Sequence, residues 1–149
     1  MRYKLSAPAT LHTTIQLPAS KSISNRALIL HALAQGCITP ANLSDCDDTR
    51  VMIKALDGNP EHIDILAAGT AMRFLTTYLS VTPSTRIITG TERMQQRPIR
   101  ILVDALRELG AQIEYAGKEG YPPLRITGTE LTGEEITLAW KHRLINAYE

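Results

Sequence analysis

The sequence predicts an α/β domain, and two observations carry this prediction. Short apolar runs with a period of two alternate along the chain with longer segments whose apolar residues recur every three or four positions. That alternation is typical of strands and helices packed in layers. At 149 residues, with 44% hydrophobic and 21% charged side chains, the chain is long enough to bury one core.

In the first half we expect a strand, a helix, a short strand and a second helix, over residues 10–17, 22–34, 42–43 and 48–56. The inward face of the first helix is predicted to hold Ile23, Ala27, Leu30 and Ala34. In the second helix, Met52 and Leu56 lie four residues apart and share a face. Residues 57–60 (Asp-Gly-Asn-Pro) form a clear turn.

In the second half we expect strands over 63–66, 85–89, 112–116, 124–127 and 135–138, and helices over 70–80 and 98–109. Helix 70–80 should turn Met72, Leu75 and Leu79 toward a core. Helix 98–109 should start at Pro98, which suits a first helical position, and stop before Gly110.

The first chemical motif is the run Lys-Ser-Ile-Ser-Asn-Arg-Ala-Leu over residues 21–28. Ser22 and Arg26 are four residues apart, so they lie on one face of the first helical turn, with Lys21 just ahead. The unpaired N–H groups and the positive dipole end of that turn favour an anion such as phosphate or carboxylate. A serine-capped helix with solvated basic residues is the alternative, and the motif alone leaves it open.

Two further segments repeat this chemistry. Residues 63–75 run from a strand through small residues to Gly69 and then Thr70, a plausible helix cap, and small residues let a ligand approach the backbone. In residues 93–99, Arg97 should lie at the start of the helix that begins at Pro98, where a cation is locally unfavourable. A bound anion would compensate for the positive charge of Arg97, although a carboxylate from elsewhere in the fold could do the same. For the segment at Gly69, an ordinary strand-to-helix turn remains the alternative.

These three motifs, in this order, resemble the 5-enolpyruvylshikimate-3-phosphate (EPSP) synthase family of enolpyruvyl transferases, from about residue 11 to residue 137. The resemblance implies transfer of the enolpyruvyl group of phosphoenolpyruvate to the 5-hydroxyl of shikimate 3-phosphate, in chorismate and aromatic amino-acid biosynthesis. It implies that Lys21 is catalytic and touches both substrates. Ser22 and Arg26 would bind shikimate 3-phosphate, and Gly69 and Arg97 would bind phosphoenolpyruvate.

The resemblance also implies a fold of βαβαββ units, the inside-out α/β barrel of enolpyruvyl transferases, which this chain would contain incompletely. Residues 1–149 would be the N-terminal portion of such an enzyme, with a divergent or non-native tail over 139–149 where the family has a Ser-Ser-Gln motif. Two positions depart from the family, which usually has Asn at Ala67 and often has Pro at Phe74. The family's principal acid/base carboxylate belongs to the C-terminal domain, so this chain alone is expected to be inactive.

Other classes are disfavoured. A net charge of +1 and 5% aromatic residues do not indicate a nucleic-acid partner, and no apolar run reaches the ~20 residues that span a bilayer. With no signal-peptide pattern, we expect a cytoplasmic protein with free thiols at Cys37 and Cys46. Asp45, Asp47 and Asp48 lack a full metal-ligand set, and Asp47 or Asp48 should cap the next helix. No metal or cofactor is expected.

Two alternatives to the synthase remain. One is a non-catalytic domain that binds small anions. The other is a relative of the UDP-N-acetylglucosamine enolpyruvyl transferases, a family that typically has Lys-Asn where this chain has Lys21 and Ser22.

Overall fold

The computed structural model describes residues 12–35, 40–58 and 60–131, together with positions 3, 4, 6, 8, 10 and 136. Its elements follow the predicted alternation in the second half of the chain. In order they are α1 (Lys21–Leu33), α2 (Asp47–Asp57), β1 (His62–Asp64), α3 (Gly69–Ser80), β2 (Thr85–Thr89), α4 (Glu92–Gln95), α5 (Arg100–Glu108), β3 (Gln112–Tyr115) and β4 (Leu124–Thr127).

Four strands form one sheet in the order β1-β2-β4-β3. Strand β1 pairs with β2 in parallel, whereas β4 pairs with β2 and with β3 in antiparallel fashion. Helix α3 connects the parallel pair, and α4 and α5 connect β2 to β3. The segment from His62 to Thr127 is therefore one complete βαβαββ unit, of the kind that the family resemblance implies.

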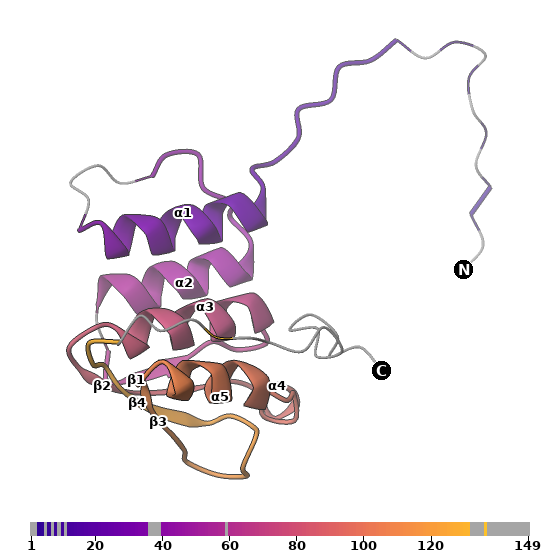
Figure 1. Cartoon of the computed structure of the whole chain (residues 1–149). Helices are drawn as coiled ribbons and strands as arrows, with labels where there is room; N and C mark the ends of the chain where they lie inside the picture. The colour runs from indigo at the N-terminus through magenta and orange to yellow at the C-terminus, as the bar shows by residue number, and fades with distance from the viewer. Residues whose placement is uncertain are drawn as a thin grey trace.

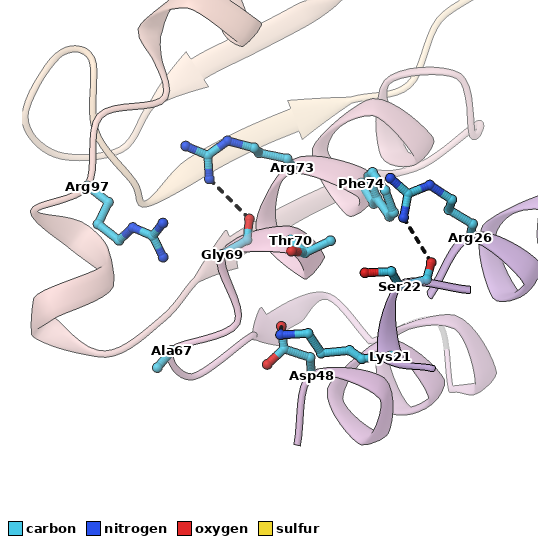
Figure 2. A pocket seen from close by; sticks show the side chains of 10 residues that line it. All are labelled: Lys21, Ser22, Arg26, Asp48, Ala67, Gly69, Thr70, Arg73, Phe74 and Arg97. Carbon is cyan, nitrogen blue, oxygen red and sulfur yellow. Dashed lines mark hydrogen bonds and ion pairs between the residues drawn. The ribbon is translucent and has the colours of Figure 1, made fainter. Parts of the chain in front are cut away.

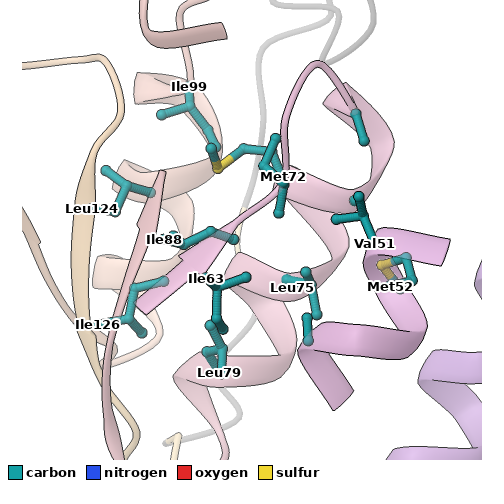
Figure 3. Packing of buried hydrophobic residues seen from close by; sticks show 14 of the residues in the cluster. Val51, Met52, Ile63, Met72, Leu75, Leu79, Ile88, Ile99, Leu124 and Ile126 are labelled. Carbon is teal, nitrogen blue, oxygen red and sulfur yellow. The ribbon is translucent and has the colours of Figure 1, made fainter. Parts of the chain in front are cut away.

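The helices lie in layers on one side of this sheet (Figure 1). Helices α3 and α5 pack against the strands, and α1 and α2 pack against α3 and against each other. The core lies between α3, α5 and the sheet, and Figure 3 shows Met72 and Leu75 of α3 within the same cluster as Ile88, Leu124 and Ile126 of the strands. Strand residues alternate between this buried face and solvent, as expected for a sheet covered on one side.

The predicted inward face of α1 is wrong. Ile23 is 71% exposed and Leu30 is 66% exposed, whereas Ser24, Asn25 and Leu28 are buried. The helix is rotated so that a polar strip, and not the apolar stripe, faces α2. Periodicity alone identifies an apolar face, but it does not show which neighbour covers that face.

Two of the predicted strands are also wrong within the described residues. Position 10 and residues 12–17 form no strand, and Ile15 and Leu17 are 73% and 83% exposed. Residues 42 and 43 lie in a bend and a loop, with Asn42 at a φ of 53°. A strand needs an edge to pair with, and the one sheet of the described residues pairs with neither segment. The strand expected over 135–138 lies outside the described residues, apart from position 136.

The predicted helix 98–109 is shorter in the structure, and a separate short helix precedes it. Residues 92–95 form the short helix α4, which the sequence analysis missed, and α5 begins at Arg100 with Ile99 as its N-cap residue. None of the helices described is long and apolar enough to cross a membrane.

Candidate functional site

The first wall of the site is the start of α1. Ser20 is the N-cap residue, and its hydroxyl accepts a hydrogen bond from the amide of Ile23 at 3.4 Å. Arg26 lies one turn into the helix and donates from Nη1 to the carbonyl of Ser22 at 2.9 Å. The Cζ atom of Arg26 also lies 5.4 Å from the centre of the Phe74 ring on α3. These contacts bring the Lys-Ser-x-Ser-Asn-Arg motif against the start of α3.

The second wall is the turn that leads into α3. Leu66 has a φ of 52°, a left-handed conformation that is rare for a leucine, and its amide donates to the carboxylate of Asp64 at 2.8 Å. This turn ends at Ala68, the N-cap residue of α3, which offers no side-chain cap. The first amides of α3 therefore receive no capping side chain from the N-cap residue, as in helix starts that bind anions. The expectation that Thr70 is the cap is wrong, because the helix already begins at Gly69.

Arg73 repeats on α3 the arrangement of Arg26 on α1. Its Nη1 donates to the carbonyl of Gly69 at 3.1 Å, four residues earlier in the helix. Arg73 was not among the site residues predicted from the sequence. The same spacing of four that linked Ser22 to Arg26 also links Gly69 to Arg73, and this was the signal that could have found it.

Arg97 reaches the site from the turn between α4 and α5. A Cβ atom built on Gly69 would lie 2.9 Å from Cζ of Arg97, so the guanidinium lies directly over the glycine. The absence of a side chain at Gly69 is what allows this close approach. The prediction that Arg97 begins a helix is wrong, because α5 starts at Arg100 and the amide of Ile99 donates to the carbonyl of Gly120. The site therefore uses two helix starts, those of α1 and α3.

These walls enclose a cavity of about 400 Å³. Figure 2 shows its lining, which holds all of the site residues predicted from the sequence and several that were not: Lys21, Ser22, Arg26, Asp48, Ala67, Gly69, Thr70, Arg73, Phe74 and Arg97. Four of these side chains are cationic and one is a carboxylate. The volume is in the range of small-molecule sites, and the excess of positive charge suits a ligand with more than one anionic group.

The single carboxylate of the cavity belongs to Asp48. Its Oδ2 atom lies 3.4 Å from Nζ of Lys21, and the two side chains are 22% and 48% exposed. Asp47 and Asp48 were expected to cap α2, but the N-cap residue is Cys46 and both aspartates lie in the first turn. Asp48 is therefore a neighbour of the predicted catalytic lysine, a role that the sequence analysis missed.

Two residues of the first motif face away from the cavity and hold α1 in place. The hydroxyl of Ser24 accepts from the amide of Ser44 at 2.8 Å, and the buried amide oxygen of Asn25 accepts from the hydroxyl of Thr49 at 2.9 Å. The Thr49 hydroxyl also lies 3.4 Å from the sulfur of Cys46. Burial raises the pKa of the Cys46 thiol, but hydrogen bonds from Ser44 and Thr49 outweigh it, so the pKa lies below its ordinary value.

Within the described residues, no group of three or more His, Cys, Asp or Glu side chains could hold a metal ion. Of the two cysteines, Cys46 is a free thiol, and Cys37 lies outside the described residues. What the cavity offers is charge and hydrogen-bond donors, arranged around two helix starts.

The fold and the cavity together define a class of protein, an α/β unit with a cation-rich cavity at the starts of two helices. The chain belongs to the EPSP synthase (3-phosphoshikimate 1-carboxyvinyltransferase) family, because the model of that family matches residues 5–59 and 58–141.

The relatives place the chain within that family. It is 75% identical over 138 residues to a 3-phosphoshikimate 1-carboxyvinyltransferase of Bacteroides fragilis. The aligned residues cover 93% of this chain and 34% of the relative. A Shewanella halifaxensis protein of the same name is 41% identical over 152 aligned positions, covering 85% of this chain and 36% of the relative. The chain thus spans about one third of the length of the curated relatives it matches.

Solved structures support the fold. An EPSP synthase from Acinetobacter baumannii matches with a TM-score of 0.69 over 82% of this chain and 34% of that structure, at 24% sequence identity. At this identity the likeness concerns the fold alone, and it agrees with a partial enolpyruvyl transferase architecture.

Proposed function

We propose that this chain is the N-terminal portion of an enzyme that transfers the carboxyvinyl group of phosphoenolpyruvate to shikimate 3-phosphate, and that its cavity carries part of the active site. One observation carries the proposal. The three motifs span residues 21 to 97 of the chain, and the substrate-binding residues predicted in them line a single cation-rich cavity. A random arrangement of helix starts would not bring Lys21, Gly69 and Arg97 to one place.

The roles follow from position. Ser22 and Arg26 at the start of α1 would bind shikimate 3-phosphate, since a guanidinium forms paired, charge-assisted hydrogen bonds with phosphate. Gly69 and Arg97 would hold phosphoenolpyruvate, because the guanidinium lies over the start of α3 and its amides. Lys21 lies between the two regions and would contact both substrates (Figure 2).

The reaction joins the 5-hydroxyl oxygen of shikimate 3-phosphate to carbon 2 of phosphoenolpyruvate and releases phosphate. The vinyl carbon must gain a proton and later lose one, and the attacking hydroxyl must lose its proton. The cations of this cavity would orient the two anions and stabilise negative charge as it shifts between them. Acid/base groups are expected from the part of the relatives' length that this chain does not span.

The test compares the chain with a longer protein. Residues 1–138 would be joined to the remaining two thirds of the Bacteroides fragilis relative, and phosphate release would be measured with both substrates. We expect turnover by the chimera, none at enzyme-like rates by the 149-residue chain, and a large loss of turnover in the chimera on Lys21→Ala.

Lys54→Ala provides the control, because Lys54 is an exposed cation of α2 that does not line the cavity. A chimera that binds shikimate 3-phosphate without turnover would favour a non-catalytic anion-binding domain. Turnover with UDP-N-acetylglucosamine in place of shikimate 3-phosphate would assign the chain to the other transferase family. Robust turnover by the chain alone would refute the proposal of a partial site. The cytoplasmic location and the tail boundary at residue 139 stay predictions.

A further inference from the structure

The ring of Phe74 contacts the one arginine of α1 that lines the cavity. Phe74 lies on α3, next to Arg73, and its ring centre is 5.4 Å from Cζ of Arg26. A guanidinium within about 6 Å of an aromatic ring centre is attracted by the negative face of the ring. Figure 2 shows the two side chains side by side at the margin of the cavity.

Phe74 is itself held by the core. It is half-buried, packs against the buried cluster around α3, and lines both the cation-rich cavity and an apolar groove formed by α1 and α3. Arg26, by contrast, is an exposed side chain. The ring thus offers a rigid surface to a flexible partner.

The Arg26 side chain is restrained twice. Its Nη1 donates to the carbonyl of Ser22 at 2.9 Å, and its Cζ atom lies over the ring of Phe74. The hydrogen bond and the aromatic ring together restrict the orientation of the group, and they reduce the rotamer freedom that an arginine loses when it binds an anion.

We infer that Phe74 is a positioning residue, which orients the guanidinium of Arg26 for the phosphate of the substrate. This inference rests on the proposed function, because it assigns Phe74 a part in the binding of shikimate 3-phosphate.

The test titrates shikimate 3-phosphate into the 149-residue chain at low ionic strength and follows the heat. Phe74→Leu keeps an apolar side chain against the core but removes the ring, and we expect it to raise the Kd by about two- to fivefold. Phe74→Tyr retains the ring and should restore the parent Kd. Tyr78→Leu is the matched control, since Tyr78 lies one turn further along α3, packs on the same cluster and lines only the groove.

A double-mutant cycle separates positioning from packing. In an Arg26→Ala background, Phe74→Leu should leave the Kd unchanged, because its effect passes through Arg26. An equal effect of Phe74→Leu in both backgrounds would refute the inference and indicate packing alone. The NMR signal of the Arg26 Nε–H group adds a readout that needs no ligand: Phe74→Leu should remove a ring-current shift that Phe74→Tyr retains.

The outcomes distinguish the two proposals. If Arg26→Ala weakens binding while Phe74→Leu does not, the positioning role is wrong and the proposed function stands. If the parent chain binds no shikimate 3-phosphate, or Arg26→Ala leaves the Kd unchanged, the assignment of Arg26 fails and the role of Phe74 fails with it. Absence of the ring-current shift in the parent would also overturn the inference.

Discussion

Helices α1 and α3 carry the same local device but are held in the fold in different ways. In each, an arginine one turn into the helix donates to a carbonyl of the first turn, Arg26 to Ser22 and Arg73 to Gly69. Helix α3 packs between the sheet and the other helices, with Leu75 and Leu79 buried in the core. Helix α1 packs only on α2 and α3 among the elements it substantially contacts, and it leaves Leu30 and Leu33 exposed.

The difference shows that the same arrangement at a helix start can be supported by two kinds of packing. The start of α3 is fixed by hydrophobic burial, which is large and non-directional. The start of α1 is fixed by directional hydrogen bonds that Ser24 and Asn25 accept from the segment that precedes and begins α2. Substitutions that remove one kind of support should therefore affect the two helices unequally.

The largest expected difference in stability is between substitutions on the apolar faces of the two helices. Leu75→Ala, at 0% exposure on α3, should lower the free energy of unfolding by about 2–5 kcal/mol, the usual range for a buried leucine. Leu30→Ala, at 66% exposure on α1, should change it by no more than about 0.5 kcal/mol. Urea denaturation followed by circular dichroism measures both, and equal losses would contradict the comparison.

The next expected difference is between the effects of two arginine substitutions on the binding of the two substrates. In the chimera with the Bacteroides fragilis relative, Arg26→Ala should weaken shikimate 3-phosphate binding by about 1.5–3 kcal/mol, the value of a hydrogen bond to a charged group. Arg97→Ala should act mainly on phosphoenolpyruvate. Steady-state kinetics with each substrate varied in turn would measure the split.

The control for this pair is Lys54→Ala. Arg107, although remote from the cavity, is unsuitable as a control, because it donates to the carbonyl of Ile113 and stacks on Tyr115. If Arg26→Ala and Arg97→Ala raised the KM of both substrates to the same extent, the assignment of one substrate to each helix start would be wrong.

A smaller effect tests the polar support of α1. Thr49→Val preserves the shape of the side chain but leaves the buried amide oxygen of Asn25 without its donor, which should cost about 1–2 kcal/mol. Thr77→Val on α3 is the matched control, since its hydroxyl donates to a backbone carbonyl at an exposed position. In thermal unfolding, Thr49→Val should lower the melting temperature more than Thr77→Val does. Equal melting temperatures would show that the hydrogen bonds of α1 add little to stability.

Only a small effect on stability is expected at the start of α3. Gly69→Ala would place a methyl group against Arg97, but the tip of that arginine is flexible, so the free energy of unfolding should change by less than about 1 kcal/mol. The displaced guanidinium should nevertheless raise the KM for phosphoenolpyruvate in the chimera more than the KM for shikimate 3-phosphate. An unchanged KM for phosphoenolpyruvate would remove Gly69 and Arg97 from that substrate's site.

The predictions from sequence succeeded where the signal was local. The bounds predicted for β2 and β4 agree with the structure, and Met72, Leu75 and Leu79 are buried as expected. They failed where a neighbour decided the outcome. Residues 12–17 have a strand-like pattern but pair with no edge, and the apolar stripe of α1 faces solvent because a polar strip faces α2.

The candidate site shows the same division. Lys21, Ser22, Arg26, Gly69 and Arg97 were singled out from their motifs, and all of them line the cavity. Arg73, Asp48 and Phe74 were not, although two of them lie within or beside those motifs. Arg73 could have been found from its spacing of four from Gly69. The place of Asp48 and Phe74 in the cavity depends on how α1, α2 and α3 pack against one another, and no spacing within one helix carries that information.

The amino-acid sequence by itself determined the residue types of the three motifs, the family to which the chain belongs, and the alternation that builds a βαβαββ unit, because each depends on neighbours along the chain. Only the tertiary structure decided that Arg97 lies at the start of α3 and not of α5, that Asp48 pairs with Lys21, and that Phe74 lies against Arg26. These contacts join residues from different elements, so their geometry is set by packing across the core.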